Sequence, residues 1–390
     1  MFQVDKSLEK PERVMLVGVM LDTDYAAGGA GGQFFYSAES RKAHFQTALD
    51  EAADLVRAAG GELVAVETSK RDRPHSALFV GTGKAEELAA SVRLHDVGLV
   101  VFNHELTPTQ ERNLEKELQC RVLDRVGLIL AIFAKRAQSQ EGKLQVELAQ
   151  LSHLSGRLVR GYGHLQSQKG GIGLKGPGET QLETDRRLIN QKITALKRQL
   201  KNVRQQRATR RQSRMGGRLK TFAIVGYTNA GKSSLFNRLT KAGVLAENQL
   251  FATLDTTARR LFLSHEVSVI LTDTVGFVRD LPHKLVSAFS ATLEETALAD
   301  VLLHVVDVSN PEFGRQMEDV NAVLEEIGAH EIPQLAVYNK IDLQPSEERK
   351  TGIVHDAAEK AAAVNISVAE NLGLDDLRQA MIERALEGRR

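Results

Sequence analysis

The sequence Phe222-Ala-Ile-Val-Gly-Tyr-Thr-Asn-Ala-Gly-Lys-Ser-Ser234 begins as an apolar run typical of a strand and ends in a glycine-rich turn. Gly226 and Gly231 permit a tight turn whose backbone N–H groups point inward, toward a bound anion. Lys232 can reach the β- and γ-phosphates of a nucleotide, and the Ser233 hydroxyl can ligate Mg²⁺. Apolar residues then recur at helical spacing, so a helix is predicted to follow the turn. This context favours a phosphate-binding loop over an ordinary glycine-rich turn.

Two motifs that follow later predicted strands specify the nucleotide. In Asp-Thr-Val-Gly at 273–276, the Asp273 carboxylate can hold Mg²⁺ through water and the Gly276 N–H can sense a γ-phosphate. In Asn-Lys-Ile-Asp at 339–342, Asp342 can pair with both N1–H and the exocyclic amine of guanine, an arrangement that adenine cannot reciprocate. We therefore predict that the nucleotide is GTP.

Two further segments complete the predicted nucleotide site. Ile366-Ser-Val368 is predicted to supply a backbone N–H to the guanine carbonyl, and within residues 250–257 Thr253 is the best candidate for a second Mg²⁺ ligand and γ-phosphate switch. The predicted Mg²⁺ ligands are Ser233, Thr253 and Asp273. The predicted catalytic residues are Lys232, Thr253 and Gly276. The predicted nucleotide-binding residues are Gly226, Tyr227, Thr228, Asn229, Ala230, Gly231, Lys232, Ser233, Phe251, Ala252, Thr253, Leu254, Asp255, Asp273, Thr274, Val275, Gly276, Asn339, Lys340, Ile341, Asp342, Ser367 and Val368.

The residue after Gly276 bears on the rate of hydrolysis. Phe277 stands where many GTPases carry a glutamine that orients the attacking water. Intrinsic hydrolysis is therefore expected to be slow, with stimulation supplied by a partner or by a cation. Asn229 resembles a position that in some GTPases helps to hold a monovalent cation, so stimulation by K⁺ is a hypothesis.

The composition limits the class of protein. The 390 residues predict two or three domains, and 42% hydrophobic and 26% charged residues with a net charge of +1 are typical of a soluble globular protein. A single cysteine, Cys120, excludes an intramolecular disulfide. The longest apolar run, 126–134, is too short to span a bilayer, and the N-terminus lacks the pattern of a signal peptide. We expect a cytoplasmic protein, monomeric and without stable membrane insertion.

Residues 1–137 are predicted to form an N-terminal α/β domain. Strands are expected at 13–21, 62–67, 98–103 and 121–123, alternating with helices at 37–59, 84–94 and 107–118, a pattern typical of a parallel sheet covered by helices. Within this domain Gly81-Thr-Gly-Lys84 resembles part of a phosphate loop but lacks its full spacing. An ordinary strand-to-helix turn is the favoured interpretation, and a second nucleotide site the weaker alternative.

Residues 138–215 are predicted to form a long antiparallel helical hairpin. Leucines at three- and four-residue intervals mark one arm, and an apolar seam marks the other, at Ile189, Ile193, Leu196, Leu200 and Val203. The joining loop is expected at 168–183, where its glycines and Pro177 oppose a helix, with Thr180 and Glu183 as a capping box for the second arm.

Basic residues accumulate along the second arm. After Asp185 no acidic residue appears until Glu247, and thirteen basic residues fall between Asp185 and the next predicted strand. An isolated run of charge is usually a solvated face, but a run without compensating carboxylates favours binding to a phosphate backbone. Few aromatics accompany it, so structured RNA recognised by shape is more plausible than base stacking.

Residues 216–390 are predicted to form a P-loop GTPase domain with a doubly wound sheet, joined to the hairpin by a linker at 216–218. Strands are expected at 221–225, 267–272, 301–306, 334–338 and 362–366. Helices are expected to begin at Gly231, Ala288 and Phe313, and a last helix to run from 374 to 386.

The motif Gly-Gly-Ile-Gly-Leu-Lys-Gly-Pro-Gly-Glu-Thr-Gln-Leu-Glu-Thr-Asp-Arg-Arg at 170–187 occurs together with Lys70-Arg-Asp-Arg-Pro74, Gly81-Thr-Gly-Lys84 and Phe251-Ala-Thr-Leu-Asp255. In combination they resemble the HflX family of ribosome-associated GTPases, over almost the whole chain. The resemblance implies binding to the large ribosomal subunit, with the N-terminal domain and the hairpin loop reaching rRNA near the peptidyl-transferase region. It also implies nucleotide-dependent splitting or rescue of stalled ribosomes under stress.

Three features depart from the family pattern. Thr256 stands where proline usually follows Leu-Asp, and Val368 replaces the usual alanine after Ser367. Because the sequence ends soon after the last predicted helix, we expect the extra C-terminal domain of some members to be missing. These differences concern the switch, the base pocket and any contact that the extra domain makes.

Two functional hypotheses follow. In the first, a ribosome-acting GTPase uses its nucleotide to reposition the basic hairpin. In the second, an RNA-binding remodeller or chaperone works through the hairpin and the first domain, with ATP at the Gly81–Lys84 turn.

Overall fold

The computed structural model describes residues 11–22, 38–158, 177–214, 219–241, 250–251, 257–279 and 290–387. The chain forms two compact units: unit 1 comprises Met1–Lys135 and Glu147–Lys197, and unit 2 comprises Arg136–Val146 and Arg198–Arg390. The helices of the expected hairpin are thus divided between the units, while the three-part division at 137 and 215 stays a prediction.

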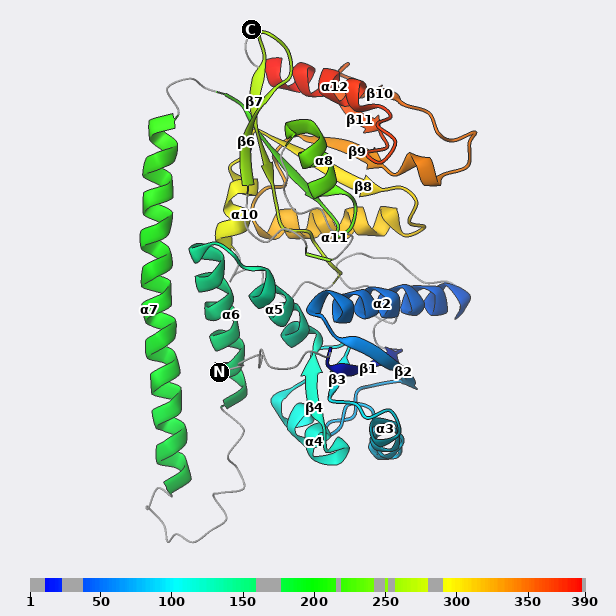
Figure 1. Ribbon diagram of the computed structural model, residues 1–390, viewed down its shortest axis with the longest axis vertical. Helices are drawn as coiled ribbons and strands as arrows, with labels where there is room; N and C mark the ends of the chain where they lie inside the picture. The colour runs from blue at the N-terminus through cyan, green and yellow to red at the C-terminus, as the bar shows by residue number, and fades with distance from the viewer. Residues whose placement is uncertain are drawn as a thin grey trace. The chain divides into compact units, whose positions relative to one another are not determined.

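Unit 1 contains the expected four-stranded parallel sheet, in the order β2-β1-β3-β4. Its strands are β1 (Arg13–Leu21), β2 (Glu62–Arg71), β3 (Leu99–Phe102) and β4 (Arg121–Asp124). The helices between them are α2 (Ala38–Ala59), α3 (Thr82–Leu94) and α4 (Pro108–Leu118). In Figure 1, α2 lies on one face of this sheet and α3 and α4 on the other, and β1 is buried over most of its length.

The turn at the start of α3, which contains Gly81 to Lys84, directs its lysine to carboxylates of the protein rather than into an open phosphate-binding loop. The Lys84 ammonium pairs with the carboxylates of Glu67 at 3.0 Å and Glu87 at 3.1 Å. These partners raise the pKa of Lys84, against the lowering effect of burial. Because the lysine is directed to two carboxylates of its own unit, the geometry favours the ordinary strand-to-helix turn.

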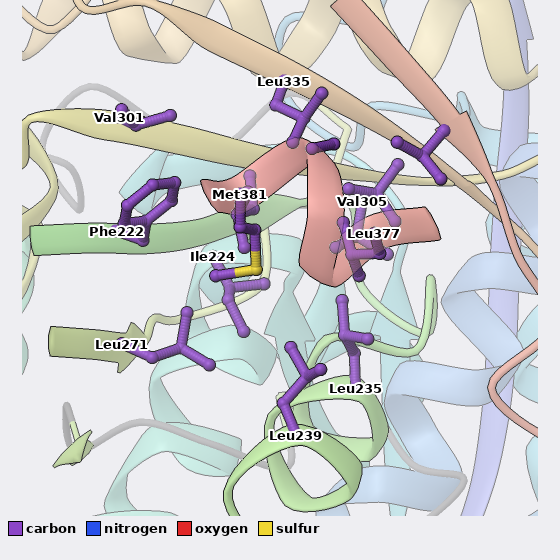
Figure 2. Close-up of a cluster of buried hydrophobic side chains, with 14 of the residues drawn as sticks. Phe222, Ile224, Leu235, Leu239, Leu271, Val301, Val305, Leu335, Leu377 and Met381 are labelled. Carbon is purple, nitrogen blue, oxygen red and sulfur yellow. The ribbon is translucent and has the colours of Figure 1, made fainter. Parts of the chain in front are cut away.

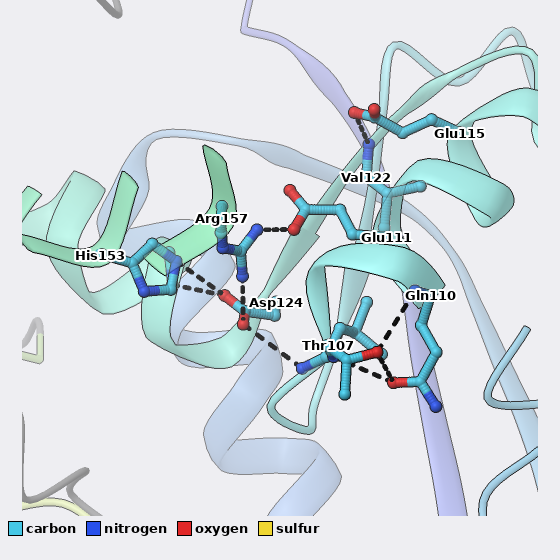
Figure 3. A network of polar contacts seen from close by, with 10 residues as sticks. Thr107, Gln110, Glu111, Glu115, Val122, Asp124, His153 and Arg157 are labelled. Carbon is cyan, nitrogen blue, oxygen red and sulfur yellow. Dashed lines mark hydrogen bonds and ion pairs between the residues drawn. The ribbon is translucent and has the colours of Figure 1, made fainter. Parts of the chain in front are cut away.

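A buried ion-pair network holds the end of one long helix to the sheet of unit 1 (Figure 3). Asp124, at the end of β4, accepts a hydrogen bond of 2.6 Å from Arg157 near the end of α6 (Gln140–Leu158), and Arg157 also pairs with Glu111 of α4. Burial raises the pKa of Asp124 to about 6 and lowers that of Arg157. Each charge is therefore costly alone, and the pairing compensates both.

The two long helices of the predicted hairpin are α6 and α7 (Pro177–Arg214). The sequence prediction was wrong at the start of α7, because residues 177–183 are helical and Thr180 lies inside the first turns rather than at the N-cap. Proline suits the first helical position, where its missing N–H has no partner to lose and its φ is already helical. Pro177 thus begins the helix that it was expected to exclude. The antiparallel pairing of α6 with α7 stays a prediction.

The apolar seam of α7 is confirmed by burial. Leu196 and Leu200 of this seam are buried, and Ile189, Ile193 and Val203 are half-buried. The basic side chains that the structure describes on this helix are exposed, namely Arg186, Arg187, Lys192, Lys197, Arg198 and Lys201. Lys220, counted in the same basic run, behaves differently, because its ammonium donates to the carbonyls of Arg384 and Glu387 in unit 2. The expected linker at 216–218 lies outside the described residues.

Unit 2 contains a seven-stranded sheet in the order β10-β11-β9-β8-β5-β7-β6. Five strands match the prediction: β5 (Thr221–Gly226), β7 (Ser268–Asp273), β8 (Val301–Asp307), β9 (Gln334–Asn339) and β11 (Ala361–Asn365). Two antiparallel edge strands were missed, β6 (Thr257–Phe262) and β10 (Gly352–His355), so the sheet is mixed. Leu261 is the one buried residue of β6 and β10 has none, so neither strand carries an apolar pattern that a sequence can reveal.

Helices cover both faces of the central strand β5. On one face α8 (Lys232–Thr240) and α12 (Leu374–Leu386) share a core with β5, including Phe222, Leu235 and Met381 (Figure 2). On the other face α10 (Ser290–Ala297) and α11 (Phe313–Glu326) pack with a second cluster. The predicted helix start at Ala288 lies outside the described residues. Because β5 is central and buried on both faces, the loop at its carboxyl end has a rigid base.

Candidate functional site

The loop between β5 and α8 has the backbone geometry of a phosphate-binding turn. Gly226 has φ of +147°, and a Cβ there would lie 2.2 Å from the carbonyl oxygen of Val305. Gly231 has φ of +95°, and a Cβ there would lie 2.3 Å from Nδ2 of Asn339. Both positions therefore require glycine. The N-terminus of α8 follows at once, with its unbonded N–H groups available to an anion.

Lys232 is placed at the first position of that helix. Its side chain is buried, and its Nζ donates to the carbonyl of Tyr227 at 2.5 Å, across the turn. Burial lowers the pKa of Lys232 to about 8, and the nearby Asp273 carboxylate opposes this shift. A bound phosphate would add negative charge beside the ammonium and so favour its charged form.

Two of the predicted metal ligands come together. The hydroxyl of Ser233 donates to Oδ2 of Asp273 at 2.8 Å, and Asp273 is fully buried at the end of β7. Hydroxyl and carboxylate oxygens are donors that Mg²⁺ prefers, so this pair fits the metal. The third predicted ligand, Thr253, lies outside the described residues with Ala252, Leu254 and Asp255. Phe251, just before them, is buried and has φ of +56°.

The segment after Asp273 lies against the phosphate loop. A Cβ on Gly276 would lie 2.8 Å from Cγ2 of Thr228 and 2.9 Å from Nζ of Lys232. The Gly276 backbone is therefore beside the lysine, where a γ-phosphate sensor is needed. The Thr274 hydroxyl is turned into the sheet, where it donates to the carbonyl of Ile224 at 2.6 Å. Contacts of Thr274 with nucleotide would accordingly use its backbone.

Asn339 joins the loops of the site. Its Nδ2 donates to the carbonyl of Ala230 at 2.8 Å, and its Oδ1 accepts the N–H of Val368 at 3.1 Å. The side chain thus holds the phosphate loop and the loop after β11 together, a role that the sequence did not indicate. Within the segment 366–368, which was predicted to supply a backbone N–H to the guanine carbonyl, the N–H of Val368 is engaged in this contact. The Ser367 hydroxyl accepts the N–H of Glu370 at 3.1 Å, which closes the same loop.

The predicted base-binding side chains differ in their partners. Oδ1 of Asp342, in the short helix η1 (Ile341–Leu343), is buried and has no hydrogen-bond partner in the described part of the chain. An unsatisfied buried carboxylate oxygen is costly, and the two donors of a guanine edge would satisfy it. Lys340 has φ of +66° and its Nζ pairs with Asp307 at 2.6 Å. Asp307 was not singled out from the sequence, because it lies more than thirty residues earlier, at the end of β8.

Phe277 is a core residue rather than a water-orienting one. Its side chain is almost fully buried in a cluster with Tyr227 and Leu293. Its backbone forms an isolated parallel bridge with Tyr227, in which the N–H of Thr228 donates to the carbonyl of Phe277 at 2.7 Å. No polar group is available on this side chain to position a nucleophile.

Known families match the chain along most of its length. Residues 46–134 match the family described as GTP-binding GTPase N-terminal, residues 136–214 the GTP-binding GTPase Middle Region, and residues 221–340 the 50S ribosome-binding GTPase. The GTPase HflX of Escherichia coli strain K12 is 53% identical over 336 residues, which cover 86% of this chain and 78% of that protein. The chain belongs to the HflX family of GTPases. The GTPase HflX of Magnetococcus marinus is 49% identical over 333 residues, covering 85% of this chain and 76% of the relative.

One solved structure resembles this chain in fold over nearly its whole length. A crystal structure of SsGBP in complex with GDP has a TM-score of 0.52 at 22% identity, covering 96% of this chain and 99% of that chain. At that identity the likeness concerns the fold alone. Membership of the HflX family, with its P-loop GTPase domain, identifies the chain as an enzyme that binds and hydrolyses GTP. None of the helices in the described ranges is long and apolar enough to cross a membrane.

Proposed function

We propose that this GTPase binds the large ribosomal subunit and splits or rescues stalled ribosomes under stress, as a cytoplasmic monomer. The observation that carries the proposal is the exposed basic face of α7, where six described lysines and arginines stand clear of the covered apolar seam. Such a face, with no acidic residue on α7 after Asp185, suits an RNA phosphate backbone. The family description of residues 221–340 as a 50S ribosome-binding GTPase supports the same partner.

In the proposed nucleotide site each residue has a distinct task. Lys232 binds the β- and γ-phosphates, the Gly276 N–H binds the γ-phosphate, and Asp342 selects guanine. Ser233, Asp273 and Thr253 would hold Mg²⁺, which supplies positive charge to the transferring phosphoryl group. The Asn339 side chain keeps the phosphate and base loops in register through its two hydrogen bonds.

Hydrolysis is proposed to depend on outside help. Because Phe277 is buried and apolar, the chain's own described residues at this position give the attacking water no polar partner. Large subunits are expected to raise turnover, and K⁺ held near Asn229 is a second source of stimulation. Equal GTPase rates in K⁺ and Na⁺ would contradict the role of K⁺.

Sedimentation of purified large subunits with the protein tests the ribosomal proposal. We expect co-sedimentation with a non-hydrolysable GTP analogue and less with GDP. Replacing Lys192, Lys197 and Lys201 on α7 by glutamate should abolish pelleting, whereas the same three charge reversals at exposed residues between β9 and α12, Arg349, Lys350 and Lys360, should not. Unchanged pelleting of the α7 variant would contradict this assignment, and an absence of GTPase stimulation by subunits would favour the RNA-remodeller alternative.

A further inference from the structure

Tyr227 touches the nucleotide site and the segment that follows Gly276 at the same time. Its backbone carbonyl accepts the ammonium of Lys232 at 2.5 Å. Its phenol oxygen, inside the protein, accepts the backbone N–H of Arg279 at 2.6 Å. Tyr227 is 5% exposed, so this second hydrogen bond is shielded from water. One residue therefore links the phosphate-binding lysine to a point three residues beyond Gly276.

The side chain of Arg279 extends the link to another element. Its guanidinium pairs with the Glu312 carboxylate at 2.8 Å, and the arginine side chain is 7% exposed. Glu312 is the N-cap residue of α11 and lies five residues after Asp307, which pairs with the base-binding Lys340. The ion pair between Asp307 and Lys340 thus joins the start of the loop 307–312 to the base-binding segment. The ion pair between Glu312 and Arg279 joins its end to the segment after Gly276.

The same region is already held to the phosphate loop through its backbone. The N–H of Thr228 donates to the carbonyl of Phe277 at 2.7 Å, and the N–H of Phe277 donates to the carbonyl of Gly226 at 3.2 Å. Residues 277–279 are therefore fixed at backbone and side chain, with Gly276 immediately before the fixed part. The position of the Gly276 N–H follows from these contacts, since two peptide units cannot move far from an anchored neighbour.

We propose that Tyr227, Arg279 and Glu312 form a tether that positions the Gly276 N–H against the γ-phosphate, and that the three act as positioning residues for GTP hydrolysis. The tether matters only for a nucleotide that carries a γ-phosphate, since GDP lacks the group that Gly276 would bind. Weakening it should accordingly affect GTP turnover and leave GDP binding intact. The proposal concerns hydrolysis by this unit and does not depend on the ribosome as partner.

Two small substitutions test the tether. Tyr227→Phe removes only the phenol oxygen, and Glu312→Gln removes only the charge that Arg279 pairs with. We expect each to lower kcat for GTP by about tenfold, the effect of roughly one buried hydrogen bond, with KM and GDP affinity changed less than about twofold. Glu325→Gln, at an exposed position of the same helix α11, is the matched control and should leave kcat unchanged.

The double variant distinguishes a shared tether from two separate effects. If both residues act through Arg279, Tyr227→Phe with Glu312→Gln should lose about tenfold in kcat, whereas independent effects would multiply to about a hundredfold. A multiplied loss would overturn the tether, as would a kcat for Tyr227→Phe within about twofold of the unaltered protein. A parallel fall in GDP and GTP-analogue affinity, with a lowered Tm, would assign these residues to folding alone. If Glu312→Gln yields no folded protein, the kcat and GDP affinity of Tyr227→Phe decide the question.

Discussion

Replacing Asp124 by asparagine should destabilise unit 1 through the buried network of Figure 3. The Asp124 side chain is 0% exposed and Arg157 is 16% exposed, with 2.6 Å between Oδ2 and Nη2. Asp124 also accepts the N–H of Leu106 at 3.3 Å and that of Gly127 at 2.7 Å. Asparagine is neutral, so Arg157 loses its counter-charge. It also has only one acceptor oxygen, and its NH₂ group would face the N–H donors that now bind the second carboxylate oxygen.

The expected cost of this change is about 3 kcal/mol, typical of removing one partner of a buried ion pair. Arg157→Met should cost a similar amount, because it leaves the Asp124 and Glu111 carboxylates without their cation. Combining Asp124→Asn with Arg157→Met should cost less than the sum of the two, since both single variants lose the same Asp124–Arg157 contact and only the Glu111 carboxylate is then left without its cation.

Hydrogen exchange of the peptides covering β4 and the end of α6 is the appropriate assay, because a chain of two units need not unfold in one step. Each single variant should lose about a hundredfold in protection, the equivalent of about 3 kcal/mol. Asp54→Asn is the matched control: its pair with Arg57 is equally short, 2.6 Å, but the side chains are 54% and 62% exposed. Loss of this exposed ion pair should change the protection from hydrogen exchange very little. Strictly additive costs in the double variant would refute the reasoning.

Three further predictions concern unit 2. Asp342→Asn should weaken GTP binding by about a hundredfold and favour a xanthine nucleotide, whose C2 carbonyl accepts where guanine donates; retained GTP affinity in competition binding would contradict the assignment. Gly226→Ala should abolish nucleotide binding, because the new methyl would lie 2.2 Å from the Val305 carbonyl oxygen, and normal GDP affinity would exclude this strain. Burial lowers the pKa of His304 from 6.5 to about 4, so between these values the unfolded chain binds a proton that the folded chain does not. The contribution of His304 to the free energy of unfolding is therefore complete above pH 6.5 and falls by about 3 kcal/mol as the pH drops to about 4. Hydrogen exchange of the β8 amides should show this loss, and His304→Leu should reduce it.

The sequence was most informative where buried elements follow one another closely. Strand β5, its loop and α8 were predicted because an apolar run, paired glycines and helical spacing occur within about twenty residues. The edge strands β6 and β10 escaped prediction because Arg259, Arg260 and the exposed β10 residues carry no apolar alternation. Pro177 was misjudged because the sequence alone does not distinguish a proline at the first position of a helix from a proline that ends one.

Long-range partnerships could not be inferred from spacing. Asp124 meets an arginine 33 residues away, and Asn339 reaches a carbonyl 109 residues away in the phosphate loop. The Asn339 contact depends on the strand order of its sheet, which places the carboxyl ends of distant strands at one edge, and the Asp124 contact depends on where helix α6 packs. The motif Asn-Lys-Ile-Asp therefore indicated which residues serve the base, but not that its first residue braces the loops while its last keeps an unsatisfied oxygen.

The register of the edge strand β6 places the end of the segment that carries the predicted switch residue beside the predicted metal ligand Asp273. Thr257, the first residue of β6, is paired with Asp273, and Phe251 is buried at the other side of the five intervening residues. Thr253 is four residues from Thr257 in the sequence, and four residues of extended chain span at most about 14 Å from Thr257, the partner of the predicted metal ligand Asp273. In the proposed site, the Thr253 hydroxyl would therefore come from a segment that is joined covalently to the neighbour of Asp273, so its effective concentration at the metal would be set by the length of that segment rather than by diffusion.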